Sequence, residues 1–377
     1  MCHQEENLSK KMQFMPILMP KHSPQILSYM KKIIVFSALL FGVTVSTAQD
    51  LGSVLLASDD SNRLLQNYLN PAMKGLMSSM NGGWYSTAKS HKKFGFDITF
   101  GLNAAFTPNK DKVFEFIAND YNFISHIDGD TNVPTVLGND NANTSFDVLI
   151  PYDGGDFKAG SFELPGGIAK DLPANAVPTP FVQVGLGLPF KTTIKLRYVP
   201  KVNFSSKSNA NLIGVGLQHD LTQYLGLVGK LPFSVSLFGA YTTSSVNYSI
   251  ENGDVSDQIL VSNGSAQFKL NTWTVQALGS LDFKIVTLYG GIGLNGGKST
   301  FNINGDYDLT YQIESADGTN QGSIVESISD PLSLKFNSSE TRATLGARLN
   351  LAFLKIFADY TLQEYNTATL GVAFSFR

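Results

Sequence analysis

Residues Phe94–Phe106 read FGFDITFGLNAAF, a stretch in which one parity is aromatic or aliphatic and the other is polar or small. Because side chains along a β-strand point to opposite faces in turn, this alternation predicts a strand with one apolar and one polar face. The stretch is longer than the usual strand of about 5 or 6 residues in soluble proteins. Its length suits a tilted strand that crosses a membrane, which needs about 9–11 residues.

The same alternation recurs along the chain, and we recognise ten such strands. After the first, their apolar faces run through 182–188, 194–198, 213–217, 233–237, 273–277, 288–294, 345–351, 356–360 and 370–376. Residues 107–180 leave room for roughly two to four more at this strand length. The sequence therefore predicts an all-β membrane protein, an antiparallel transmembrane β-barrel of about 10–14 strands.

The connections between these strands are unequal in length. Short connections lie near Pro189, at 282–284 and at 352–355. Residues 250–264 and 304–333 are long and polar, and strand counting puts them at the opposite end of the barrel. Outer-membrane barrels have short periplasmic turns and long outer loops, so the short connections predict the periplasmic end. Residues 219–230 are the exception, a longer periplasmic segment expected to hold one or two helical turns.

The chain contains a candidate targeting sequence at 30–48, MKKIIVFSALLFGVTVSTA. A basic start, an apolar run and the small residues Ser46, Thr47 and Ala48 form the layout of a secretory signal peptide. We therefore expect Met30 to be the true start of the protein. Residues 1–29 would then be an upstream extension that was assigned to the protein in error. The alternative is a soluble chain with an apolar N-terminal helix.

Composition narrows the class of protein further. The single cysteine, Cys2, precedes the expected cleavage point, so neither a disulfide framework nor a cysteine metal site is expected. A formal net charge of −3 gives no electrostatic case for nucleic acid. Together with the leader, these features predict the outer membrane of a Gram-negative bacterium.

Residues 49–93 differ from the barrel at 94–377 and predict a short helical hatch. Asp60 or Ser61 is a candidate N-cap, followed by an apolar set at Leu64, Leu65 and Leu69. Asn70-Pro71 is expected to interrupt the first helix, and a second is expected to end near 81–83. Two placements remain open: a plug inside the barrel, or a helix packed under the periplasmic rim.

Two motifs carry a resemblance to a known family. YLNPAMKGL, with Asn70, Pro71 and Ala72, resembles the N-terminal hatch of the FadL-like outer-membrane transporters of hydrophobic compounds. PTPFVQVGLGLPFKTTIKLRYVP, residues 178–200, resembles a membrane hairpin of the same family. The overall layout is similar to a group of uncharacterised Bacteroidetes outer-membrane β-barrel proteins. The resemblance implies a barrel of 14 strands, which we take as the best guess, and passive uptake of a ligand.

A glycine-rich stretch at 289–300, YGGIGLNGGKST, looks at first like a nucleotide loop. A dinucleotide fingerprint needs a helix that opens at its third glycine. Here Phe301 and Ile303 alternate with polar residues instead. Glycine in a strand allows another segment to approach closely, so we interpret the stretch as a barrel strand.

Other site candidates are weak. Asp128, Asp130 and Asn132 begin like an EF-hand loop, but Val133 and Asn139 stand where glycine and glutamate are required. An ordinary polar loop and a calcium-stabilised loop both remain open. The histidines of the mature chain lack metal spacing: they are His91, His126 and His219. We expect no metal, no cofactor and no enzymatic activity.

Charged residues within the strands all fall on the polar parity. They are Asp97, Lys195, Arg197, Arg342, Arg348 and Asp359. A charge that faces lipid at mid-depth costs roughly 2–4 kcal/mol, so these side chains are expected to face the lumen. Two roles remain open: ion pairs that hold the hatch and neighbouring strands, or a constriction that selects solutes.

The leading functional hypothesis is passive uptake of a small hydrophobic or amphipathic compound. The alternatives are a structural or surface-interaction barrel without transport, and a soluble secreted β-protein. The expected partners are outer-membrane lipid, the barrel-assembly machinery during insertion and a small hydrophobic ligand, with no nucleic acid. Residues 367–377 are expected to close the barrel against 94–106, with both apolar sets facing lipid.

Overall fold

The computed structural model describes residues 57–376 with short gaps. The gaps are 128–130, 139–142, 153–154, 204–205, 227–231, 251, 257–258 and 315–319. The expected extension at 1–29 and the signal peptide at 30–48 lie outside the described residues. So do Asp128 and Asp130 of the calcium-like loop.

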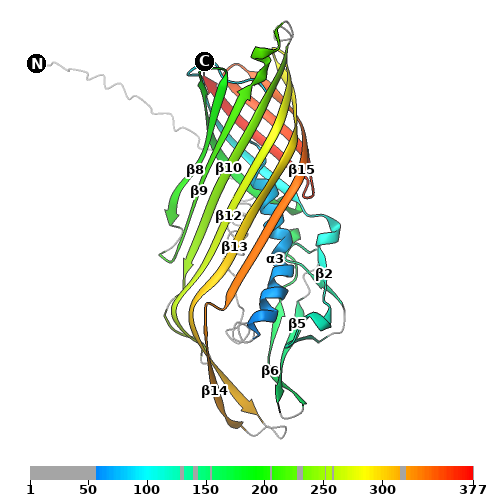
Figure 1. Ribbon diagram of the computed structural model, residues 1–377, viewed down its shortest axis with the longest axis vertical. Coiled ribbons are helices and arrows are strands. Elements are labelled where there is room, and N and C mark those ends of the chain that lie inside the picture. Colours follow the sequence, from blue (N-terminus) through cyan, green and yellow to red (C-terminus); the bar gives the residue numbers. More distant parts are fainter. Residues whose placement is uncertain are drawn as a thin grey trace, which may run out of the picture.

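The chain forms an antiparallel transmembrane β-barrel around an N-terminal helical hatch (Figure 1). Ten strands close the ring in the order β1-β7-β8-β9-β10-β12-β13-β15-β16-β17, and β17 pairs back to β1. Their bounds are β1 Phe96–Phe106, β7 Ala176–Leu188, β8 Thr192–Asn203, β9 Ser208–Asp220, β10 Phe233–Ser249, β12 Ile259–Asp282, β13 Val286–Glu314, β15 Leu332–Leu351, β16 Leu354–Leu362 and β17 Thr367–Phe376. Closure leaves no free strand edge where β1 meets β17, as a lipid environment requires.

The pairing of the last strand with the first is confirmed. β17 runs antiparallel to β1 from Phe376 opposite Phe96 to Thr367 opposite Ala105. Phe96 and Phe376 stack with ring centroids 5.0 Å apart, and both are exposed on the outer face. Thr99 and Thr369, on the other parity, are buried inside. The apolar sets of both strands therefore face lipid.

The best guess of 14 strands is wrong, because the ring closes with ten described strands, at the lower limit of the expected range. The region expected to hide further membrane strands contains short ones in two small sheets outside the ring. They are β2 Val113–Glu115, β3 Ile124–His126, β4 Asn132–Pro134, β5 Thr144–Tyr152 and β6 Gly155–Leu164. Three of these have only 3 residues, too short to cross a bilayer. They pack beside the helix instead (Figure 1).

The two ends of the barrel differ. The turn end carries the C-terminal strand end and the short turns at 189–191, 283–285 and 352–353, as the sequence predicts. Of the one or two helical turns expected at 219–230, the described part of this segment contains one, the 3-10 helix η5, Leu221–Tyr224. At the opposite, extended end, β10, β12, β13 and β15 project beyond the other strands (Figure 1). Two further strands join them there, β11 Gly253–Ser256 and β14 Asn320–Ser329.

The hatch, residues 58–93, begins with one helix, α3, Ser58–Met80. The expected interruption at Asn70-Pro71 is wrong, since Pro71 lies inside the continuous helix. A proline removes a helical hydrogen bond, but its neighbours Ala72 and Met73 are buried, and this packing offsets the loss. The helix ends at Asn81 as expected.

Asp60 and Ser61 do not cap α3, which begins earlier, with Ala57 at the N-cap position. The Asp60 carboxylate instead accepts hydrogen bonds from the backbone N–H groups of Asn122, Phe123 and Ile124, at 2.6–3.2 Å. It thereby ties the segment between β1 and β7 to the helix.

Among the described residues, no helix combines the length and apolar character needed to cross a membrane.

The long strands invert their polarity partway along. On β12, the outward side chains change from Trp273 and Val275 to Asn271 and Lys269 toward the extended end. The inward side chains change in the opposite sense, from Thr274 and Thr272 to apolar ones. β13 and β15 change at the same level, where Asn271, Lys298 and Asn337 lie side by side.

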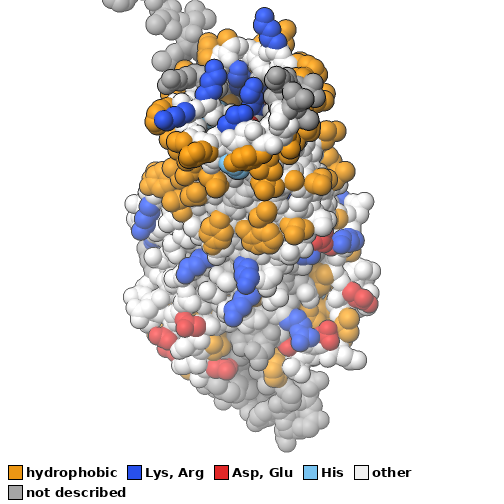
Figure 2. All heavy atoms as spheres, turned by 45° about the horizontal axis from the view of Figure 1, so that its top comes forward, with side chains coloured by type: hydrophobic (Ala, Val, Ile, Leu, Met, Phe, Trp, Pro, Cys, Tyr) orange, Lys and Arg blue, Asp and Glu red, His pale blue; other side chains and the backbone are white. Residues whose placement is uncertain are grey.

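This inversion marks the limit of the membrane. Between this level and the turn end, the outer surface of the barrel is an apolar belt, and Figure 2 shows the belt on the face in view, with a polar surface beyond it. Toward the extended end, the inner faces of the strands are apolar and pack on α3. Members of this core include Leu64, Met73, Phe162, Phe268, Leu270, Phe301, Leu334 and Phe336. The extended end is therefore built like a water-soluble domain, continuous with the membrane barrel.

Candidate functional site

The six charged residues singled out in the sequence all lie on the inner face of the ring. Lys195, Arg197, Arg342 and Asp359 are buried, and Asp97 and Arg348 are nearly so, with 13% and 15% of their side chains exposed. The structure does not gather them into one constriction. The four cations instead contact the hatch from different sides of the ring.

Two guanidiniums meet the C-terminal end of α3. Arg197 donates to the carbonyl oxygens of Met80, at 3.0 Å, and Gly82, at 2.7 Å. Arg342 donates to the carbonyl of Asn81 at 2.8 Å. The last carbonyls of a helix have no partner within the helix and form the negative end of its dipole. The two arginines satisfy them from opposite walls and thus hold the helix end in place.

Arg197 is also enclosed by aromatic rings. Its guanidinium carbon lies 3.8 Å from the ring centre of Trp84 and 4.2 Å from that of Phe181. Gly83, at a positive φ of 68°, would place a Cβ 2.5 Å from Phe181, so this packing requires glycine there. Trp84, Arg197 and Phe181 therefore form one stack across the lumen.

Lys195 and Arg348 hold the next part of the hatch. The Lys195 ammonium donates to the Trp84 carbonyl at 2.6 Å. Arg348 donates to Ser86 Oγ at 3.3 Å and lies 3.8 Å from the Asp282 carboxylate. Asp97 contacts His91, near the end of the hatch.

Asp359 is the exception, because it accepts a hydrogen bond from the ring strand residue Tyr289, at 2.9 Å. Tyr289 in turn packs against the hatch through an edge contact with Tyr85. Asp359 therefore supports the hatch indirectly.

The glycine-rich stretch lies within β13, as interpreted from the sequence. A Cβ on Gly291 would come within 2.5 Å of the Tyr85 hydroxyl, and one on Gly297 within 2.9 Å of Met77. These glycines face the lumen and leave room for the hatch.

The hatch motif of the sequence lies elsewhere on the helix. Pro71 and Ala72 are buried and Asn70 is half-buried, in the middle of α3. They do not touch the aromatic stack, which follows the helix end.

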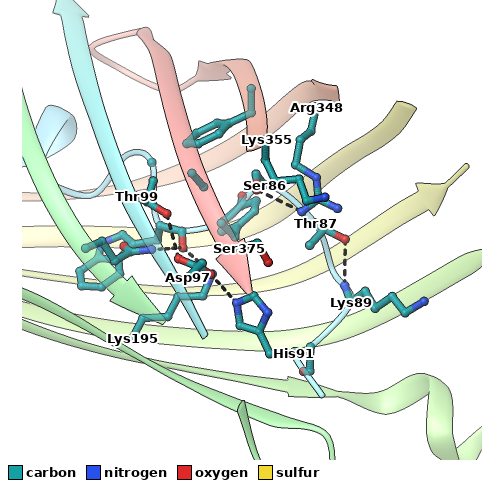
Figure 3. A pocket seen from close by; sticks show the side chains of 17 residues that line it. Ser86, Thr87, Lys89, His91, Asp97, Thr99, Lys195, Arg348, Lys355 and Ser375 are labelled. Atoms are coloured by element: carbon teal, nitrogen blue, oxygen red, sulfur yellow. Dashed lines mark hydrogen bonds and ion pairs between the residues drawn. The ribbon is translucent and has the colours of Figure 1, made fainter. Parts of the chain in front are cut away.

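A cavity of about 150 Å³ lies between the last hatch residues and the inner wall at the turn end (Figure 3). It is lined by Gly83–Thr87, Lys89–His91, Asp97, Thr99, Gln183, Lys195, Arg348, Lys355, Phe357, Ala373 and Ser375. Four of these side chains are cationic and one, Asp97, is a carboxylate. The arrangement can hold a negatively charged group.

The wall has a seam between β7 and β8. Their pairing begins at Leu188 opposite Thr192 and ends at Gln183 opposite Arg197. Both strands continue toward the extended end, where β7 still pairs with β1 and β8 with β9. Among the described residues, 176–182 and 198–203 do not pair with each other.

Three prolines border the seam. Backbone N–H groups alternate in direction along a strand, and Gly187 directs its own toward β1. Even-numbered positions of β7 therefore face β8, and among them Pro178 and Pro180 have no N–H to offer. Pro200 borders the seam on the β8 side, at the register shift between Val199 and Val202.

The seam begins at the edge of the apolar belt. On the β8 side, Tyr198 is level with Asn271 through Ile213 and Thr243, at the polarity inversion. Pro180 is level with Leu102 and Leu370, which face lipid on the next two strands. Val199 is on the inward parity of β8, yet 39% of it is exposed, whereas Thr193 on the same parity is buried. Unpaired backbone in lipid costs several kcal/mol per group. An unpaired stretch of this kind is therefore an exception to the pairing that lipid demands of a barrel wall.

Sequence reasoning missed both the aromatic stack and the seam. The stack joins Trp84 to strands far away along the chain, which no local pattern reveals. The seam did have a signal, since Pro178 and Pro180 stand two apart within a predicted strand, where proline is confined to edges.

Several solved structures are similar in part. The translocator domain of autotransporter NalP from Neisseria meningitidis is 11% identical, covers 84% of this chain and 98% of its own, with a TM-score of 0.30. The outer membrane protease OmpT from Escherichia coli gives 11% identity, 78% and 99% coverage and a TM-score of 0.30. The P. putida toluene transporter TodX gives 8% identity, 83% and 93% coverage and a TM-score of 0.22. The strand pairing itself closes the ring.

No curated protein matches the sequence significantly. One protein family does, over residues 30–376, nearly the whole chain. The chain belongs to this family, the family of unknown function DUF6588.

Proposed function

We propose that this chain is an outer-membrane barrel of a Gram-negative bacterium that admits a small hydrophobic or amphipathic compound from the bilayer, through the seam between β7 and β8. The observation that carries the proposal is the loss of strand pairing beyond Gln183 and Arg197, at the edge of the apolar belt. A compound dissolved in lipid meets no paired backbone there.

The hatch blocks the route along the barrel axis, which favours lateral passage through the wall. The hatch fills the lumen, and its contacts with the ring involve strands on every side. Arg197 and the Trp84 ring lie between the seam and the cavity at the turn end, since Arg197 borders the first and Trp84 lines the second. Movement of this stack is the step that connects the two.

A cross-link across the seam tests the proposal. The register extended by one residue places Val182 opposite Tyr198, so a disulfide between V182C and Y198C locks the two strands together where the seam begins. As a matched control, L102C with L370C joins two strands that are already paired. No other thiol competes in the expected mature protein. The sequence has one cysteine, Cys2, and it precedes the expected cleavage point.

Each protein is placed in liposomes, and uptake of a hydrophobic fluorescent probe is followed. The reduced proteins and the oxidised L102C/L370C control should accelerate uptake, and oxidised V182C/Y198C should not. Uptake no faster than in empty liposomes for any protein contradicts the proposal. So does equal uptake with the seam locked and open.

A second candidate is a surface-interaction barrel without transport, and it is favoured by the extended end. β13 alone has 29 residues, far more than the membrane requires. This candidate predicts that locking the seam changes nothing, so the same experiment separates the two.

A further inference from the structure

We propose that the cavity at the turn end is a binding site for a small oxyanion of phosphate size, taken from solution. The inference does not rest on transport through the seam. Three observations support it: the charges that line the cavity, the lack of carboxylates within hydrogen-bond distance of these cations among the described residues, and buried hydrogen-bond donors there without acceptors.

The lining is strongly cationic. Lys89, Lys195, Arg348 and Lys355 contribute four positive groups against the single carboxylate of Asp97. That carboxylate is already engaged, by His91 and by Thr99 Oγ1 at 2.9 Å. Charge excess of this kind in a lumen with low-dielectric walls attracts anions.

The cations are held by neutral or distant groups rather than by close ion pairs. Within the described residues, the Lys195 ammonium donates to the Trp84 carbonyl, and the Lys355 ammonium donates to the Ala352 carbonyl, both at 2.6 Å. Arg348 has a carboxylate at 3.8 Å, beyond hydrogen-bond distance. An ammonium carries more than one donor, so both lysines retain donors for a ligand.

Three lining residues also carry a buried donor without a partner in the described part of the chain. These atoms are Trp84 Nε1, Ser90 Oγ and Arg348 Nε. Buried polar groups are nearly always hydrogen-bonded. Donors without acceptors beside excess positive charge indicate an acceptor-rich, negatively charged ligand.

The mouth of the barrel favours the same ligand. Figure 2 shows Lys and Arg side chains gathered around the hollow at the turn end. Exposed lysines near the turns there include Lys89, Lys92, Lys93, Lys191 and Lys284. They raise the local anion concentration at the opening. An oxyanion with several acceptors matches the several donors inside.

The chain provides its own reporter. It has two tryptophans, Trp84 in the cavity lining and Trp273 on the lipid face, so W273F leaves Trp84 as the single fluorophore. Inorganic phosphate is titrated into folded W273F protein in nonionic detergent, at constant ionic strength kept with chloride. The Trp84 emission should change with a saturable, single-site dependence.

Lysine substitutions locate the site. In the W273F background, the K89Q/K355Q double variant should weaken phosphate binding about tenfold, the effect of losing about 1.4 kcal/mol. K335Q removes an exposed lysine at the extended end and should leave the affinity unchanged. Heat-modifiable migration on gels confirms that each variant is folded.

Two results overturn the proposal: no saturable response to phosphate, or equal affinity in the double variant and in K335Q. An anionic lipid-like head shares the chemistry of free phosphate, so dodecyl phosphate is titrated in parallel. Competition between dodecyl phosphate and inorganic phosphate supports the site. Binding of dodecyl phosphate alone overturns the assignment to an oxyanion from solution.

Discussion

Arg342 reaches across the lumen from β15 and donates a hydrogen bond of 2.8 Å to the backbone carbonyl of Asn81, the residue that ends α3. The contact joins a strand charge to a helix end more than 250 residues earlier in the chain. It also explains how a buried arginine is tolerated, because a helix C-terminus supplies the negative potential that it needs.

Replacing this arginine should loosen the hatch. R342M leaves the Asn81 carbonyl without its charged donor and should lower the free energy of unfolding by about 1.5–3 kcal/mol. Amide hydrogen exchange in residues 78–88 should accelerate with it. R63M is the control, since Arg63 pairs with Asp120 at 3.5 Å with both side chains about half exposed. Such pairs contribute about 0–1 kcal/mol. Equal effects of the two substitutions would contradict a role for Arg342 in holding the end of α3.

A methyl group on the lumenal face of β13 should displace the hatch. G291A places a Cβ 2.5 Å from the Tyr85 hydroxyl and 2.7 Å from Leu278. Overpacking of this kind costs about 1–3 kcal/mol. At Gly279 a Cβ meets nothing within 4 Å, so G279A should be neutral. Urea denaturation followed by Trp84 fluorescence in the W273F background measures both, and a neutral G291A would show that the hatch does not press on the strand.

A carboxylate at the extended end predicts a pH dependence. Burial raises the pKa of Glu364, but hydrogen bonds from Lys74 and Lys110, both at 3.2 Å, outweigh it and hold the pKa below its usual value. A depressed folded pKa contributes stability that is present above the unfolded pKa of about 4.3 and is lost as pH falls through the folded pKa.

Amide hydrogen exchange in residues 363–366 measures this pH dependence of stability. Protection there should fall below about pH 4 in the wild-type protein, and E364Q should remove this part of the pH dependence. The effect should stay within about 1 kcal/mol, because the site is partly exposed to solvent. An unchanged acid limb in E364Q would contradict the assignment.

The last strand should be indispensable for the ring. Deleting residues 367–377 removes the partner of both β1 and β16, so two strand edges would face lipid. The truncated chain should remain unfolded and sensitive to added protease. Replacing residues 309–326 by a short Gly-Ser linker is the control, because β14 lies outside the ring. A truncated chain that still migrates as a heat-modifiable barrel would contradict the closure.

The periodic parts of this fold could be predicted from the sequence, and the ring shows why. Alternation between Phe94 and Phe106 identifies a strand and its lipid face without any knowledge of its neighbours. Closure of β17 on β1 follows from the cost of an open edge in lipid. The strand count could not be predicted, because residues 107–175 contain short strands that pack on α3 rather than crossing the bilayer.

Tertiary contacts determine the features of the fold that local sequence patterns do not predict. Pro71 looks like a helix break, yet burial of α3 keeps the helix continuous. The polar parity of Arg197 and Arg342 predicts a lumenal position, but only the folded chain brings both to one helix end. The polarity inversion at Asn271 arises because the inner face of β12 packs on α3 beyond that residue, and only the folded chain shows this contact.

The most direct test of entry through the seam measures whether lipid reaches the inside of the wall there. V199C and T193C are each labelled with a nitroxide, and collision with oxygen dissolved in the bilayer is measured by electron paramagnetic resonance. Both positions lie on the inward parity of β8, but 39% of Val199 is exposed and Thr193 is 1% exposed. High oxygen accessibility is expected at 199 and low accessibility at 193. Equally low accessibility at both positions would show a sealed wall and would contradict entry through the seam.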